Sequence, residues 1–377
     1  MATLYNTEEA DVICAGASVR SLAFSCLRAG LRPVTCDLFY DSDLAARCPG
    51  VKIASRSWPE DILSTLERLP ALPIIYSGGL ENHPGLVRRL QDRHEIIGNN
   101  AEVLERALDP FTLSRCLEAA GLRVPEIRRA EDRSTCESEW LSKPIRGGGG
   151  IAIEPASKAK TSQGRYLQRF VDGTPASALF LAGENDSARS LLLGATEQLI
   201  GESWLGATGF TWCGNLGPLE LDGETHRQVA LGGETVAREL SLRGLFGLDF
   251  VLTDDGPVFI ELNPRYTGST EVIERCCEFD AIPHHLTSCR DGELPPAAPA
   301  VSKACAKAIL FAEAPLELTA VPGSEEESGS SFADLPRPGE KIEIGSPVLT
   351  MLTAREDLAK CRSALKRMAK ETRSSLL

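Results

Sequence analysis

The feature that most constrains the fold is a pair of apolar segments, GLFGLDFVL at 244–252 and PVFIELNPRYTG at 257–268, joined by the turn sequence TDDG. Asp-Gly between two β-prone segments predicts a hairpin. Side chains two residues apart share one face of a strand, so Glu261, Asn263 and Arg265 can converge if the strand persists that far. A strand that leaves the core with a solvated polar tip would show the same pattern. The rest of the chain must decide between the two interpretations.

Length and charge limit the classes of protein to consider. A chain of 377 residues is too long for one ordinary core and fits two or three packed units. Its formal net charge of −13 argues against a sequence-independent nucleic-acid binder, whose affinity would come from Lys and Arg on phosphates. A small molecule or a protein is the expected partner.

The sequence also indicates a cytoplasmic protein that does not enter a membrane. No apolar run approaches the ~18–20 residues that cross a bilayer, and the first residues lack a basic segment followed by an apolar one. The twelve cysteines are scattered and form no CxxC pair. We therefore expect reduced, mostly buried thiols rather than disulfides or structural zinc.

Residues 11–40 predict a βαβ unit of Rossmann type, with Asp37 at the end of the second strand. The turn GASVRS has one glycine where a dinucleotide fingerprint has three, so a nicotinamide oxidoreductase is the weaker alternative. The helix that follows could still hold a carboxylate or phosphate at its N-terminus through Gly16, Ser18 and Arg20.

A further strand at 72–79 ends in two glycines, before a helix that starts near Pro84. Open α/β folds bind ligands where parallel strands end, so Glu81 and Asn82 are candidate ligand residues, or caps of that helix. After a helical pattern at 101–121 that breaks at Asp109-Pro110, strand signals follow at 140–153, 165–173, 176–182, 189–200 and 210–221. A helix is expected at 224–242, a linker at 291–300 and a final helix at 355–373.

The segment SKPIRGGGG combines Lys143 with four consecutive glycines, Gly147, Gly148, Gly149 and Gly150. A cation at a strand end followed by a run of mobile backbone N–H groups suits a lid over a polyphosphate. A flexible surface turn is the alternative.

The predicted hairpin places Asp249 on its first strand and Glu261 and Asn263 on its second. Mg²⁺ takes hard oxygen ligands from one or two carboxylates, and the rest from phosphates and water. These three residues therefore form a candidate Mg²⁺ site, with Mn²⁺ as an alternative. Arg265, just beyond, can meet phosphate oxygens or developing negative charge.

The chain resembles the ATP-grasp superfamily of ATP-dependent carboxylate ligases. The resemblance lies in three segments and their order: the strand-end lysine with its glycine loop, the strand YLQRFVDG, and the hairpin with ELNPR. The resemblance covers roughly residues 100–290. It implies an α/β and α+β fold: a Rossmann-like pre-ATP-grasp domain at 1–107, an ATP-grasp domain at 108–290, and a C-terminal β-rich segment with a terminal helix at 291–377.

The resemblance also implies roles for individual residues. Lys143 would bind ATP phosphates beneath the glycine loop, Arg265 would steady the acyl-phosphate transition state, and Mg²⁺ would lie at the hairpin. The adenine pocket would be lined by Gln168, Phe170 and Val171, with Asp172 as the acid for the ribose. One departure is Pro110, which stands where many members carry a first ATP lysine.

The implied activity is the ATP-dependent joining of a carboxylate to an amine through an acyl phosphate. The expected partners of this cytoplasmic enzyme are its small-molecule substrates and a second copy of the chain in a homodimer. The chain also resembles ATP-grasp proteins of one-carbon cofactor pathways, through its start GASVR, its middle QLIG…CGNLGPL and its ending DLPRPGEKIEIGSPVLTML. Among these proteins are tyramine–glutamate ligases of methanofuran-type synthesis. The cofactor implied is of methanofuran or tetrahydromethanopterin type.

Two alternatives stay open beside this activity. The proline at position 110 motivates a nucleotide-binding regulatory or scaffold protein with reduced catalysis. The C-terminal segment also resembles that of carboxylases, although no biotin-carrier lysine motif is present, which leaves a biotin-independent carboxylase as the second alternative.

Overall fold

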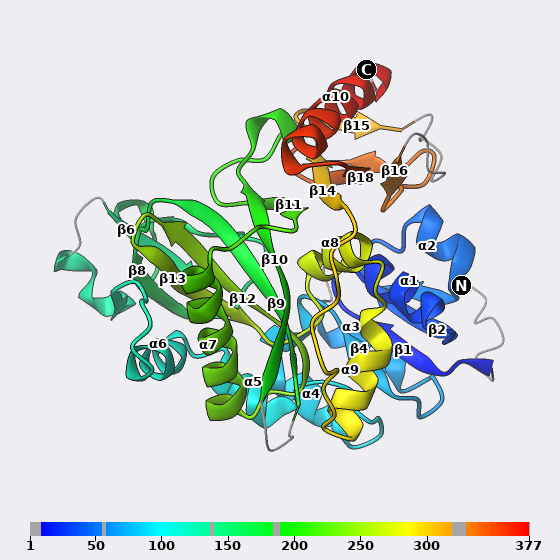
Figure 1. The fold of residues 1–377 in the computed structure, drawn as a ribbon. Helices are drawn as coiled ribbons and strands as arrows, with labels where there is room; N and C mark the ends of the chain where they lie inside the picture. The colour runs from blue at the N-terminus through cyan, green and yellow to red at the C-terminus, as the bar shows by residue number, and fades with distance from the viewer. Residues whose placement is uncertain (1–8, 55–57, 136–138, 184–188, 319–328, 377) are drawn as a thin grey trace.

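The computed structural model describes residues 9–54, 58–135, 139–183, 189–318 and 329–376. Figure 1 shows the N-terminal unit beside a large twisted sheet, with the C-terminal helix across one end of that sheet. Within the described residues, no helix is both long and apolar enough to cross a bilayer.

The N-terminal unit is the predicted Rossmann-like fold. Its four parallel strands lie in the order β3-β2-β1-β4, which is the doubly wound arrangement. The strands are β1 (Val12–Ala15), β2 (Pro33–Asp37), β3 (Gly50–Lys52) and β4 (Ile74–Tyr76). The helices are α1 (Arg20–Arg28), α2 (Ser42–Arg47), α3 (Glu60–Leu66) and α4 (Pro84–Gln91), with the short turn η3 (Leu80–Asn82) after β4.

Two helices and a small antiparallel sheet follow. The helices are α5 (Ala101–Ala107) and α6 (Pro110–Ala119), which separate at Asp109-Pro110 as predicted because Asp109 caps α6 and Pro110 is its first residue. The sheet has the order β5-β8-β6-β7. Its strands are β5 (Ile127–Arg129), β6 (Trp140–Pro144), β7 (Glu154–Pro155) and β8 (Arg165–Arg169), with the turns η4 (Ala130–Thr135) and η5 (Ala156–Lys158).

A large sheet in the order β13-β12-β9-β10-β11-β14-β18-β16 forms the centre of the molecule. Its strands are β9 (Thr174–Ala182), β10 (Ser190–Ile200), β11 (Trp212–Gly217), β12 (Gly244–Thr253), β13 (Gly256–Asn263), β14 (Ala304–Phe311), β16 (Ser330–Ala333) and β18 (Pro347–Arg355). The two-stranded pair β15 (Leu316–Glu317) and β17 (Lys341–Ile342) and the turn η6 (Ser203–Leu205) complete the strand region.

Helices cover both faces of this sheet, and its central strands are correspondingly apolar. On β9, Ala178 and Phe180 pack on the side of α7 (Gly223–Leu240), whereas Leu179 and Leu181 pack on the side of α1 and α9 (Ala281–Arg290). This two-sided burial explains why ASALFLA reads as a continuous apolar run rather than an alternating one. Helix α8 (Gly268–Cys277) lies beside α9.

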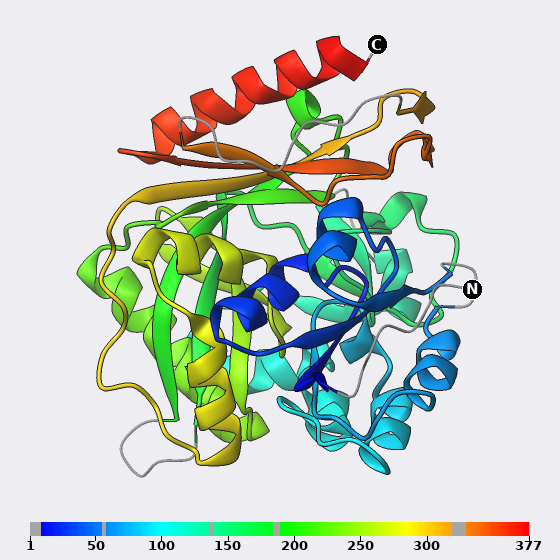
Figure 2. The ribbon, with the colours of Figure 1, turned by 90° about the vertical axis from the view of Figure 1, so that its right-hand side faces the viewer.

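The C-terminal segment continues the central sheet. Strand β14 pairs with β11 and with β18, so the sheet crosses the predicted boundary at residue 290 without a break. Helix α10 (Leu358–Leu376), the final helix that the sequence predicts, packs across β14 and β18 through Cys361, Leu365 and Met368 (Figure 2). The domain boundaries themselves stay a prediction.

Candidate active site

Strands β6 and β8 of the small sheet place Lys143 inside the molecule. Its side chain is about one-twentieth exposed, and its Nζ donates to Gln168 Oε1 at 3.3 Å. Burial opposes the charge, but neighbouring Tyr166 and Glu261 outweigh it and raise the pKa of Lys143, so the side chain is an ammonium. Gln168, expected at the adenine, thus holds the lysine.

The predicted hairpin is present and aligns the candidate metal ligands. Asp249 on β12 lies directly opposite Glu261 on β13, and Asn263 Nδ2 donates to Asp249 Oδ2 at 3.0 Å. Lys143 Nζ lies 3.6 Å from Glu261 Oε2. Cross-strand neighbours share a face, so the two carboxylates meet, and Lys143 of the small sheet lies beside Glu261.

The donor set fits a magnesium ion. Burial, followed by repulsion from the Glu261 carboxylate, raises the pKa of Asp249 to about 6. Two adjacent carboxylates and an amide oxygen are hard oxygen donors, and a divalent cation would relieve the repulsion between the acids. These residues would therefore hold Mg²⁺, and their assignment as its ligands is carried forward as a proposal.

Arg265 does not continue the strand, because β13 ends at Asn263. Its guanidinium nevertheless reaches the same place: Nη2 donates to Asn263 Oδ1 at 2.9 Å, and Nε donates to Glu81 Oε1 at 2.5 Å. The pKa of Arg265 is raised because Glu81 outweighs the cost of burial. The acid that pairs with Arg265 thus comes from the N-terminal unit.

The glycine loop is attached to that same unit. Asn82 Oδ1 accepts from the Gly147 N–H at 3.0 Å, and Asn82 Nδ2 donates to the Gly147 carbonyl at 3.2 Å. Gly150 has φ of +70°, and a Cβ there would lie 1.7 Å from the Phe210 carbonyl oxygen. Only glycine fits at position 150. Movement of the loop as a lid stays a prediction.

A cleft lies beside these groups. Its apolar wall includes Leu113, Ile153 and Ile260, and its polar groups are Glu81, Lys143, Tyr166, Glu261 and Asn263, with Gly147, Gly148 and Gly150 at the loop. Pro110 also lines the cleft, so no cation is present at that position.

Three residues that were expected to contact the adenine or the ribose lie outside the lining of the cleft. Phe170, Val171 and Asp172 are not among the described residues that line the cleft. Phe170 is 48% exposed and packs edge to face on Phe210, while Asp172 accepts from the backbone N–H of Gly173. Their contact with a nucleotide stays a prediction.

The turn after β1 has a different role from the anion site considered above. Asp37 accepts from the backbone N–H groups of Val19, Phe39 and Tyr40, each at 2.6 Å, and so occupies the N-terminus of α1 itself. Burial raises the pKa of Asp37 to about 6. Arg20 points away from this turn, toward α8 and the C-terminal strands.

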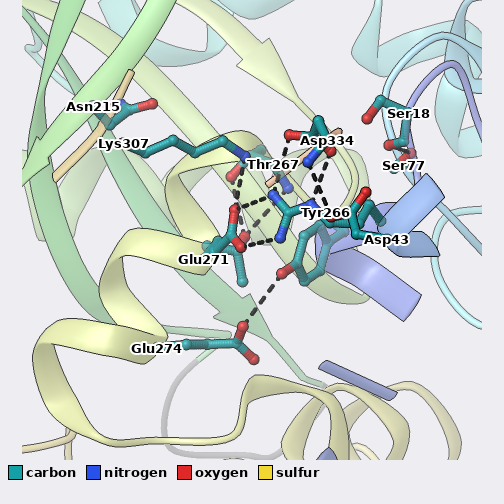
Figure 3. Close-up of polar contacts among 12 residues, drawn as sticks. Ser18, Asp43, Ser77, Asn215, Tyr266, Thr267, Glu271, Glu274, Lys307 and Asp334 are labelled. Carbon is teal, nitrogen blue, oxygen red and sulfur yellow. Dashed lines mark hydrogen bonds and ion pairs between the residues drawn. The ribbon is translucent and has the colours of Figure 1, made fainter. Parts of the chain in front are cut away.

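Sequence reasoning missed a second polar cluster, named here the interface cluster: Arg20, Glu271, Lys307 and Asp334. Figure 3 shows Glu271, Lys307 and Asp334 close together. Arg20 donates to Glu271 Oε2 at 2.9 Å and to Asp334 Oδ1 at 2.8 Å, and Lys307 donates to Glu271 Oε2 at 2.8 Å. Burial opposes the charge of Glu271, but Arg20 and Lys307 outweigh it and lower its pKa well below the usual range. The cluster joins α1, α8 and the C-terminal strands.

Comparison with known proteins now identifies the class. The model of the ATP-grasp domain family matches residues 107–269, so the chain contains an ATP-grasp domain. ATP-grasp enzymes use ATP and Mg²⁺. The matched residues include Lys143, the glycine loop, the hairpin β12–β13 and Arg265.

An uncharacterized protein of Methanocaldococcus jannaschii is 23% identical over 281 residues, which are 70% of this chain and 64% of that protein. The chain therefore spans a little less than two thirds of that relative's length.

Three solved structures share the fold at low sequence identity. The biotin carboxylase–ATP complex of Campylobacter jejuni has a TM-score of 0.73 at 15% identity, covering 95% of this chain and 90% of the other. The N5-carboxyaminoimidazole ribonucleotide synthetase of Thermus thermophilus has a TM-score of 0.70 at 19% identity, and the match covers 95% of this chain and 98% of the other. The L-amino acid ligase of Bacillus licheniformis has a TM-score of 0.68 at 14% identity, and the match covers 96% of this chain and 97% of the other.

Proposed function

We propose that this protein is an ATP-dependent ligase that activates a carboxylate as an acyl phosphate and joins it to an amine. The observation that carries the proposal is the convergence of Asp249, Glu261 and Asn263 with Lys143 and Arg265 beside one cleft. The ATP-grasp domain, and the synthetase and ligase among its structural neighbours, support the same reaction class.

The chain's own residues divide the work by position. Lys143 is a buried ammonium between the small sheet and the hairpin, where it can bind phosphate oxygens of ATP. Asp249, Glu261 and Asn263 would hold Mg²⁺, which when bound supplies charge neutralisation at the phosphates. Arg265 has a planar guanidinium at the same place and can stabilise charge that develops on the transferring phosphoryl group.

The second half of the reaction is attack by the amine on the acyl phosphate. Carbon–nitrogen bond formation releases inorganic phosphate and leaves an amide. Catalysis of this kind rests largely on positioning and on preorganised charge. The cleft offers both, because its charged groups are fixed by strands and by hydrogen bonds to other elements.

Two narrower assignments belong to this proposal. Biosynthesis of a one-carbon carrier cofactor, of methanofuran or tetrahydromethanopterin type, is supported by the sequence resemblance described above. A homodimer in the cytoplasm is the proposed assembly. The alternative of a protein with reduced catalysis keeps one structural support, the presence of Pro110 in the wall of the cleft.

The experiment that tests the proposal is a screen for ADP release across amino acids, other carboxylic acids and amines, with Mg-ATP present. The expected result is ADP formation that requires both an acid and an amine, together with an amide product of matching mass. Stable Mg-ATP binding without acid-dependent ADP release for any pair would instead support the regulatory or scaffold alternative.

A further inference from the structure

One carboxylate oxygen in the cleft has no hydrogen-bond partner among the described residues. Glu81 lies in the turn η3, is 2% exposed and lines the cleft. Its Oε1 accepts from Arg265 Nε, but its Oε2 makes no hydrogen bond. Among buried side-chain atoms of the described residues, it is the one carboxylate oxygen left in this state.

Arg265 bonds only one of the two Glu81 carboxylate oxygens among the described residues. The other two nitrogens of Arg265 donate elsewhere, Nη2 to Asn263 and Nη1 to the Tyr266 carbonyl at 3.2 Å. A buried acceptor without a donor costs roughly 1–3 kcal/mol, and more when it is charged. A donor that enters from the cleft would satisfy it.

Glu81 is also held in a fixed position. The next residue, Asn82, is bonded in both directions to Gly147 of the glycine loop. On the other side, the backbone at Gly78 packs against the Arg265 guanidinium, where a Cβ would lie 3.3 Å from Arg265 Cζ. The turn η3 thus places a carboxylate between the loop and the arginine proposed for acyl-phosphate chemistry.

We propose, on the basis of the proposed function, that Glu81 Oε2 binds the ammonium of the incoming amine and accepts a proton from it. A protonated amine has no free electron pair, so it must lose a proton before it attacks. A general base in this position typically contributes ~10²–10⁴-fold to the rate.

The ammonium gives one proton to Glu81, and the freed electron pair forms the C–N bond to the acyl carbon. The bond between that carbon and the phosphate oxygen breaks, and phosphate leaves with the second nitrogen proton. Glu81 then returns its proton to solvent. The substrate class is therefore a primary amine that is protonated at neutral pH.

The test compares two nucleophiles on the acid and amine pair that the screen identifies. Hydroxylamine is largely uncharged at neutral pH and needs no base, so it traps the acyl phosphate as a hydroxamate. In Glu81→Gln, amide formation should fall at least ~10²-fold, whereas hydroxamate formation should fall less than tenfold. Retained hydroxamate formation also shows that the variant is folded. Glu81→Asp, which keeps a carboxylate, should recover part of the amide activity.

Glu274→Gln is the matched control, because Glu274 is an equally buried glutamate of α8 outside the cleft whose oxygens accept from Arg28, Tyr266 and the Ala281 N–H. It should change both products by the same factor. Two results would overturn the inference: a parallel loss of both products in Glu81→Gln, which would make Glu81 a positioning residue for Arg265, or no loss of either. Absence of both products in the wild type would remove the proposed function and this inference with it.

Discussion

The cleft and the interface cluster bury similar charges but balance them differently. In the cluster, two cations meet two carboxylates, and the pKa of Glu271 falls well below its usual range because Arg20 and Lys307 outweigh burial. At the cleft, the described acids Asp249, Glu261 and Glu81 lie near two cations, Lys143 and Arg265, and burial, followed by repulsion from Glu261, raises the pKa of Asp249 to about 6. The ion pairs of Glu271 hold elements together, whereas the raised pKa of Asp249 marks carboxylates that are suited to a cationic ligand.

The largest effect is expected at the metal hairpin. Glu261→Gln should abolish Mg²⁺-dependent turnover because it removes a charged oxygen from the proposed metal site. Its side chain is 38% exposed, so the free energy of unfolding should change little. ADP release at limiting Mg²⁺ and thermal melting measure the two quantities. Wild-type activity at limiting Mg²⁺ would show that Glu261 does not bind the metal.

The opposite pattern is expected in the interface cluster. Glu271→Ala leaves Arg20 and Lys307 without their shared carboxylate, and removing one partner of a buried ion pair commonly costs ~3–5 kcal/mol. Glu105→Ala is the control, because Glu105 pairs with Arg88 at the surface and should lose at most ~1 kcal/mol. Denaturant titration checks both values. Equal losses would mean that the cluster does not stabilise the interface.

Arg265 should separate catalysis from binding. In Arg265→Ala, kcat should fall ~10²–10³-fold with little change in Mg-ATP affinity, since loss of one preorganised donor has about this effect. Arg265→Lys should recover little, because a point charge cannot reproduce the contacts to both Glu81 and Asn263. A variant that melts much lower but turns over normally per folded molecule would assign Arg265 to stability alone.

The smallest effect concerns the pH dependence of stability. With a folded pKa of about 6, above the usual 3.8, Asp249 keeps a proton between these values that the unfolded chain has lost. Stability from this group is therefore present at low pH and is lost as pH rises toward 6. Asp249→Asn does not titrate, so the variant does not lose this stability as pH rises.

The free energy of unfolding of Asp249→Asn relative to wild type should accordingly rise by roughly 2–3 kcal/mol between pH 4 and pH 7, because the pKa shift from 3.8 to about 6 spans about two units and each unit corresponds to about 1.4 kcal/mol. Unfolding free energies measured at both pH values without divalent cations give this difference. A gain for Asp249→Asn at pH 4 that vanished at pH 7 would reverse the predicted sign.

The sequence was most informative where the relevant contacts are local. Alternation at Glu261 and Asn263, the TDDG turn and the Asp109-Pro110 break each depend on a few neighbouring residues, and each appears in the structure. The strand pattern failed at Arg265, because the strand ends at Asn263 and the guanidinium returns by its own hydrogen bonds.

Contacts between distant segments were beyond sequence patterns. Arg20 and Glu271 lie 251 positions apart, and Glu81 and Arg265 lie 184 apart. Periodicity and turn signals describe a residue's own element and do not specify which other element packs against it. For the same reason Glu81 was recognised as a residue at a strand end, but its pairing with Arg265 was not.

The claim that the carboxylates at the cleft serve a Mg–nucleotide is tested most directly by calorimetric titration of a non-hydrolysable ATP analogue. Wild type should bind the analogue in the presence of Mg²⁺ and much more weakly in EDTA, and Glu261→Gln should lose most of the effect of Mg²⁺ while keeping its fold. Binding of equal strength with and without Mg²⁺, or equal Mg²⁺-dependent binding by Glu261→Gln and wild type, would contradict the claim.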